Sequence, residues 1–107
     1  MISEDAFIKM ALSFPAAGQA PHFERIGLRV IGRRMFATYL AKDHTANLFL
    51  THKEQRVFCK MSTGNIYPVP NKWGEKGATT FNLYKVPKEI ILEALLSAYN
   101  EVMKSKK

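Results

Sequence analysis

The residues of this chain best suited to chemistry with a ligand surround its only tryptophan. Trp73 follows a proline-rich stretch and precedes two closely spaced glycines, with Lys72 and Lys76 near it in the sequence. An exposed indole ring can stack on nucleic-acid bases, and lysines beside it neutralise phosphates. The alternative is that Trp73 folds back over the edge of the core, as large aromatic residues usually do, while the two lysines are simply solvated.

A second basic group, Arg33 and Arg34, lies at the tip of a predicted hairpin, and Lys42 at the next turn would extend it into a cluster. Guanidinium groups at such a tip suit a wing that grips phosphates or enters a groove. Hairpin tips are also commonly charged for solubility alone. The candidate nucleic-acid contacts are therefore Arg33, Arg34, Lys72, Trp73 and Lys76.

The other reactive side chains do not form a catalytic or metal-binding pattern. His44 and His52 have no second histidine or cysteine at a ligand spacing, whereas a zinc site needs three or four ligands. No base is placed beside Cys59 by the sequence, so we expect an ordinary free thiol. Gly74 and Gly77 do not match a nucleotide-binding fingerprint. We therefore expect no catalytic residues, no metal and no cofactor.

Length and charge limit the classes of protein that remain. A chain of 107 residues is expected to form a single domain. Its net charge of +7 is compatible with a nucleic-acid partner. However, three of the lysines lie in the last four residues, and the other lysines and arginines are widely spread along the chain. A single cysteine fits a reducing cytoplasm. Because the chain begins with acids and has no long apolar run, we expect neither a signal peptide nor contact with a membrane.

Capping and proline signals predict three helices. The first begins after Ser3 and ends at Pro15, and residues 15–21 are expected to be a loop. The second opens with a capping box formed by Thr51 and Glu54, and its apolar face is predicted to contain Val57, Phe58 and Met61. The third begins at residue 87, and residues 103–107 are expected to form a basic tail.

Alternating apolar residues predict five strands, at residues 22–30, 35–40, 46–50, 66–69 and 78–83. The element order α-β-β-β-α-β-β-α predicts an α+β two-layer sandwich, a five-stranded antiparallel sheet with three helices on one face. The other face would be open. Arg29 and Phe49 are expected to line it, together with Met35 and Tyr39 or their neighbours, depending on the register.

Several short segments resemble the MmcQ/YjbR family. They are the Leu-Ser-Phe-Pro step at residues 12–15, the hairpin at 27–40, Asn-Lys-Trp-Gly at 71–74, Thr-Phe-Asn-Leu at 80–83 and the final helix. The resemblance covers nearly the whole chain and implies a fold similar to secretion chaperones, with DNA binding through a double-wing arrangement. It supplies no catalytic residues. The longer loop at residues 74–77 departs from the commonest members and puts a wing at that position in doubt.

Two functions remain open from the sequence. The first is a small cytoplasmic binding domain that contacts DNA non-specifically through its basic loops. The second is a protein-interaction or homodimerising module that uses the open sheet face, since large apolar residues occur on both sides of the strand at 35–40. No residue pattern supports catalysis, so we do not expect an enzyme.

Overall fold

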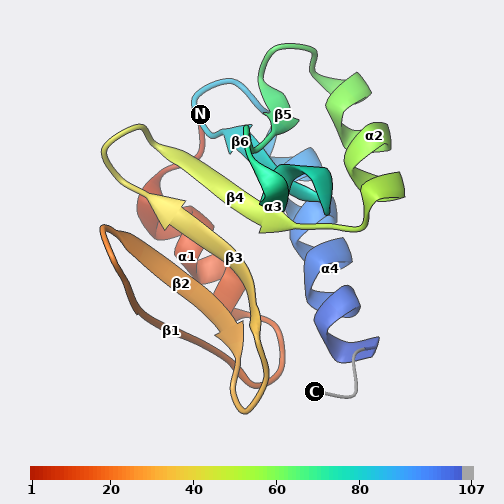
Figure 1. The fold of residues 1–107 in the computed structure, drawn as a ribbon. Coiled ribbons are helices and arrows are strands. Elements are labelled where there is room, and N and C mark those ends of the chain that lie inside the picture. Colours follow the sequence, from red (N-terminus) through yellow and green to blue (C-terminus); the bar gives the residue numbers. More distant parts are fainter. Residues whose placement is uncertain (105–107) are drawn as a thin grey trace.

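The computed structural model describes residues 1–104 and contains one antiparallel six-stranded sheet and four helices (Figure 1). The helices are α1 (Glu4–Leu12), α2 (His52–Met61), α3 (Lys72–Glu75) and α4 (Lys88–Lys104). The strands are β1 (Ala17–His22), β2 (Arg25–Val30), β3 (Met35–Leu40), β4 (Thr45–Phe49), β5 (Ile66–Pro68) and β6 (Ala78–Asn82). They lie in the order β1-β2-β3-β4-β6-β5.

The expectation of five strands and three helices is wrong, although the α+β class holds. Strand β1 occupies the segment expected to be a loop. It is an edge strand, where Pro21 is tolerated because its missing N–H is not needed by a second neighbour. Helix α3 is a single turn inside the expected Trp73 loop. It forms because the Asn71 side chain accepts hydrogen bonds from the amides of Trp73 (2.8 Å) and Gly74 (3.4 Å).

Other local predictions are confirmed. The Ser3 side chain caps α1, and Thr51 and Glu54 exchange the two hydrogen bonds of a capping box at the start of α2. The strand expected at residues 66–69 is present as β5, and it lies at an edge of the sheet. The last helix continues to Lys104, so residues 103–104 are helical, and the rest of the predicted tail, 105–107, lies outside the described residues. No helix within residues 1–104 has the length and apolar character needed to cross a membrane.

One face of the sheet packs against helices. Figure 1 shows α1 and α4 behind the sheet, whereas only the short helix α3 lies in front of it, beside β4 and β6. The side chains between these layers form the core, in which Leu28, Leu48 and Phe81 are fully buried. Burial of this apolar surface against the helices supplies the main stabilisation of the fold.

A bulge in β3 sorts the large residues of this strand between the two faces. Leu28 pairs with Ala37, but Arg29 pairs with Met35, so Phe36 is the extra residue. Its ring packs against helix-side aromatic rings, including Tyr99 at 5.8 Å. The bulge therefore places Phe36 on the helix side.

The same register decides which predicted residues line the open face. Arg29 and Phe49 lie there as expected, and Met35 lies opposite Arg29. The inclusion of Tyr39 is wrong, because its ring lies 5.8 Å from that of Phe7 on α1. The strand therefore exposes less apolar surface on the open face than the sequence suggested.

Helix α2 is rotated away from the orientation that its apolar residues suggested. Val57 and Met61 were expected to be buried, but they are 50% and 45% exposed. The buried residues are Gln55 and Phe58. The Gln55 side-chain amide donates hydrogen bonds to the carbonyls of Gly74 (2.8 Å) and Ala78 (3.0 Å), which satisfy this polar group inside the core.

A buried histidine connects the N-terminus to the β3–β4 turn. The Nε2 atom of His44 lies 2.6 Å from the carbonyl of Ile2, which can only accept, so Nε2 carries the proton. The hydroxyl of Tyr39 therefore donates to Nδ1 over 2.7 Å. Burial, and to a lesser degree Glu4 and Tyr84, raise the pKa of Tyr39, which keeps this hydroxyl protonated as the bond requires.

We expect Tyr39→Phe to lower the free energy of unfolding by about 1–3 kcal/mol, because His44 Nδ1 would remain buried without a donor. Urea denaturation measures the change. Tyr67→Phe is the matched control, since the Tyr67 hydroxyl makes no hydrogen bond within residues 1–104. Equal stability of the two variants would contradict a stabilising role for the Tyr39–His44 bond.

Candidate nucleic-acid interface

Trp73 does not fold back onto the core. It lies on α3 with 63% of its surface exposed, and the ammonium group of Lys76 is 5.4 Å from the centroid of its ring. This is cation–π geometry. Lys76 therefore occupies the space over the indole, and a base that stacks on the occupied face must displace it. Lys72, in the same helical turn, is exposed.

Two glycines hold the backbone under Trp73 too tightly for any other residue. A Cβ atom at Gly74 would collide with the carbonyl oxygen of Val69. Gly77 has a φ of +122°, and a Cβ there would collide with the carbonyl oxygen of Leu50. These glycines carry no phosphate-binding signature, but their close packing presses the α3 backbone against its neighbours. The large side chain of Trp73 is then left on the outer side.

The open sheet face next to α3 contributes further aromatic and basic groups. Phe49 is half-buried on β4, and Tyr67 is 40% exposed on β5, opposite Thr80. Arg29 is exposed on β2, and Arg25 donates a hydrogen bond to Thr38 across to β3 (3.3 Å). Tyr67 and Arg25 were not among the predicted contacts. Each lies on the opposite face of its strand from a buried residue, Leu28 for Arg25 and Ile66 for Tyr67. That alternation was the sequence signal that these two side chains would be on the open face.

Arg33 and Arg34 lie in the turn between β2 and β3. Strand β6 begins at Ala78, which pairs with the last residue of β4. The end of β4 also lies beside the start of β3, so the starts of β3 and β6 are at the same end of the sheet. The arginine turn and α3 therefore adjoin the same end of the sheet, with β4 between them, but they do not form one compact cluster. Arg33 is half-buried and Arg34 is exposed.

The expected cluster of Arg33, Arg34 and Lys42 is wrong. Lys42 follows the last residue of β3, whereas the arginines precede the first one. A six-residue strand is about 20 Å long, so Lys42 lies at the opposite end of the sheet.

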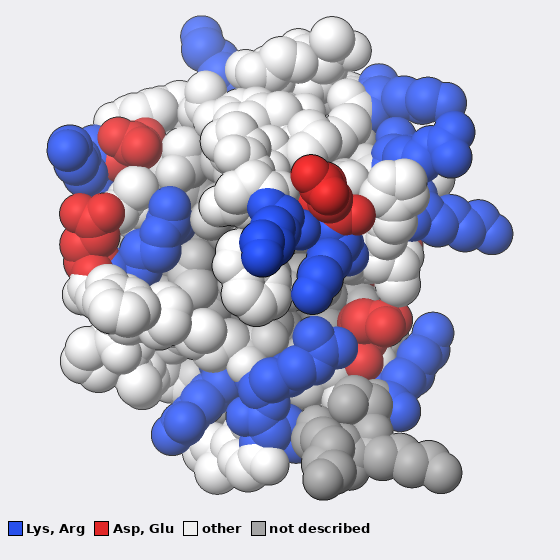
Figure 2. Space-filling view, in the orientation of Figure 1, with Lys and Arg blue, Asp and Glu red and all other residues white. Residues whose placement is uncertain are grey.

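Most basic side chains are available for a ligand. Leaving Arg33 aside, no lysine or arginine within residues 1–104 makes an ion pair. Figure 2 shows basic side chains at the centre of this face, where Figure 1 places α3, and along its lower and right edges. Acidic side chains are fewer, but Glu75 of α3 reduces the local positive charge beside Lys72 and Lys76.

The remaining reactive groups of the described chain include the histidines and one free cysteine, Cys59. No group of three or more metal-ligating side chains occurs among residues 1–104. Burial raises the pKa of the Cys59 thiol, which disfavours the nucleophilic thiolate at neutral pH. His44 is fully engaged by its two hydrogen bonds.

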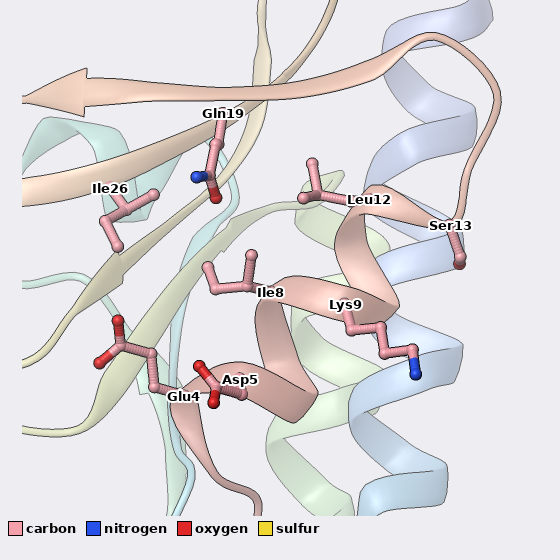
Figure 3. Close-up of a pocket in the computed structure, with 8 residues that line it drawn as sticks. All are labelled: Glu4, Asp5, Ile8, Lys9, Leu12, Ser13, Gln19 and Ile26. Atoms are coloured by element: carbon pink, nitrogen blue, oxygen red, sulfur yellow. The ribbon is translucent and has the colours of Figure 1, made fainter.

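A surface hollow of about 670 Å³ lies between α1 and strands β1 and β2, away from Trp73. Figure 3 shows Ile8, Leu12 and Ile26 along it, Glu4 and Asp5 at one end, and Lys9 directed away. Its carboxylates are unsuited to nucleic acid. The hollow therefore does not extend the candidate interface.

We expect Gly74→Ala to destabilise the protein by at least about 2 kcal/mol, because the added methyl group must displace either α3 or the Val69 backbone. Thermal unfolding measures the loss, and tryptophan fluorescence reports whether the environment of Trp73 changes. Gly18→Ala is the control, since its methyl would meet only the flexible side chain of Ile31. A Gly74→Ala variant as stable as Gly18→Ala would contradict the packing described for α3.

Comparison with known proteins identifies the fold. No protein family model matches the sequence, and no match was found among curated proteins. Among solved structures, the chain is similar to the crystal structure of the Deinococcus radiodurans protein DR2400, which is described as a DUF419 domain. The TM-score is 0.83 at 22% sequence identity, over 100% of this chain and 83% of that chain. This chain therefore has the fold of the DUF419 domain protein DR2400.

Proposed function

We propose that this protein is a small cytoplasmic domain of the MmcQ/YjbR type that binds DNA without sequence specificity. The sequence resemblance supports the family, as does the likeness in fold to a DUF419 protein, because DUF419 is grouped with YjbR/MmcQ-like families. The proposed contacts are Trp73 with Lys72 and Lys76, the arginines of the β2–β3 turn, and the open sheet face between them.

The exposure of Trp73 is the observation that carries the proposal. An indole that is 63% exposed is held toward solvent by a backbone that the Asn71 cap and two close-packed glycines fix. Stacking of one base on this ring would contribute about 1–3 kcal/mol to binding. Within residues 1–104, Lys72 and Lys76 make no ion pair, so both charges are available for phosphates.

The shape of the surface favours single-stranded over duplex DNA. Stacking on Trp73 needs an unpaired base, and Phe49 and Tyr67 offer further aromatic surface on the same face. Arg29 is three strands from the start of β6, about 14 Å at the usual strand spacing. A backbone crossing the sheet would thus meet basic groups at both sides of the aromatic residues.

We expect a fluorescent single-stranded oligonucleotide to bind with an affinity that falls steeply as salt rises. Trp73→Ala should weaken binding by about 5- to 150-fold, which corresponds to one stacked base. Replacing Lys72 and Lys76 by alanine should lower the slope of log K against log salt by about 0.7 for each lost phosphate contact. Fluorescence anisotropy at several salt concentrations measures both effects.

The matched control is the double variant Lys42→Ala, Lys85→Ala, which removes the same charge at the other end of the sheet. It should retain both the Trp73 contribution and nearly the whole salt slope. Equal effects of the two double variants would mean that binding follows net charge alone. An absence of binding at low salt would exclude the DNA-binding function.

The alternative function is homodimerisation or protein binding through the open sheet face. Its premise was exposed apolar surface on β3, but Leu40 is only 7% exposed on this face, and Thr38 and Thr80 are polar neighbours. We therefore favour DNA binding. Sedimentation velocity distinguishes the two, because a monomer across the concentration range is expected for the DNA-binding protein. A dimer that Arg29→Glu disrupts would support the alternative instead.

A further inference from the structure

The outward face of α2 presents an exposed apolar pair outside the candidate nucleic-acid interface. Val57 and Met61, one helical turn apart, are each about half exposed, at 50% and 45%. They line a surface hollow of about 510 Å³ together with Lys53, Arg56 and Lys60. Figure 2 shows basic side chains along the right edge of the molecule, where Figure 1 places α2.

The exposure of these two residues is enforced by the interior. Gln55 is 3% exposed and its side-chain amide donates hydrogen bonds to two backbone carbonyls, while Phe58 packs against Phe81 with ring centroids 6.1 Å apart. Rotating α2 to bury Val57 and Met61 would expose Phe58 and break the Gln55 bonds. The helix therefore presents an apolar pair to solvent while a polar residue is buried, the reverse of the usual pattern.

The charges around this pair are of one sign. Lys53, Arg56 and Lys60 make no ion pair within residues 1–104. The one acid of the helix, Glu54, is engaged in the capping box, where its side chain accepts from the Thr51 amide over 2.9 Å. An apolar centre with a charged rim is the composition of a protein-binding surface.

We propose that the outer face of α2 binds an acidic amphipathic segment of another protein. Two apolar side chains of the partner, one helical turn apart, would pack on Val57 and Met61, and its carboxylates would meet Lys53, Arg56 and Lys60. The proposal does not depend on DNA binding, because Trp73 and its lysines lie on α3 and the sheet face.

Two other classes of partner fit this surface less well. A helix that inserts into a membrane interface presents a broad apolar face with bulky residues, whereas α2 has ten residues and offers one valine and one methionine. A nucleic-acid backbone would contact the lysines and the arginine of this surface, but it would gain nothing from the apolar pair between them. A peptide that carries both acidic and apolar groups uses the whole surface.

The test uses two synthetic peptides of about 15 residues, one with two leucines four positions apart between glutamates, the other a scrambled version of it. We expect the first peptide to shift backbone amide NMR signals of α2 in the full-length, isotope-labelled protein, with smaller shifts from the scrambled one. An oligonucleotide and vesicles containing an anionic lipid are titrated in parallel. Shifts at α2 with either of these but not with the peptide would overturn the proposal.

Substitutions then separate the apolar and charged contributions. Val57→Ser with Met61→Ser should weaken peptide binding about tenfold or more, and Lys53→Gln with Lys60→Gln should weaken it and reduce its salt dependence. The matched control is Leu92→Ser with Leu96→Ser on α4, which changes two leucines that are 45% exposed. All four positions on α2 are exposed, so these variants should fold.

Failure of the peptide to bind at low salt would overturn the proposal, as would equal weakening by the α2 and α4 apolar variants. The α2 variants should leave oligonucleotide binding unchanged. The outcome is therefore separable from that of the DNA-binding experiments, whose variants are on other elements.

Discussion

The buried amide of Gln55 is the interaction on which both exposed surfaces of this protein depend. A polar side chain in the core must find hydrogen-bond partners, and Gln55 finds them in the carbonyls of Gly74 and Ala78. The first bond holds α3 against α2, and the second holds α2 against the start of β6. One side chain thereby sets the rotation of α2 and anchors the segment that presents Trp73.

Close backbone packing completes this arrangement. Gly74 and Gly77 allow the α3 segment to approach Val69 and Leu50 more closely than a residue with a Cβ atom could. Once the segment is pressed down in this way, little room remains beneath it for an indole. The exposure of Trp73 is therefore a consequence of two glycines and one glutamine, and it is held in place by the fold rather than left to a flexible loop.

The local features of the fold were largely predictable from the sequence. Ser3, Thr51 with Glu54, and Asn71 act within a few residues of themselves, so their capping roles could be read without the tertiary structure. The missed strand β1 contains a proline and a glycine, which indicate a loop unless an edge position is known. Helix α3 has four residues and lacks the periodic pattern by which helices are recognised.

The sequence by itself determined the α+β class, most of the strands, and the presence of an aromatic residue and basic residues near position 73. Only the tertiary structure decided which way these groups face. Apolar spacing on α2 favoured burial of Val57 and Met61, but the neighbours of Gln55 and Phe58 lie far away in the sequence. Likewise, the bulge at Phe36 changes the side on which β3 presents its residues. Orientation depends on contacts between distant segments, which local periodicity does not record.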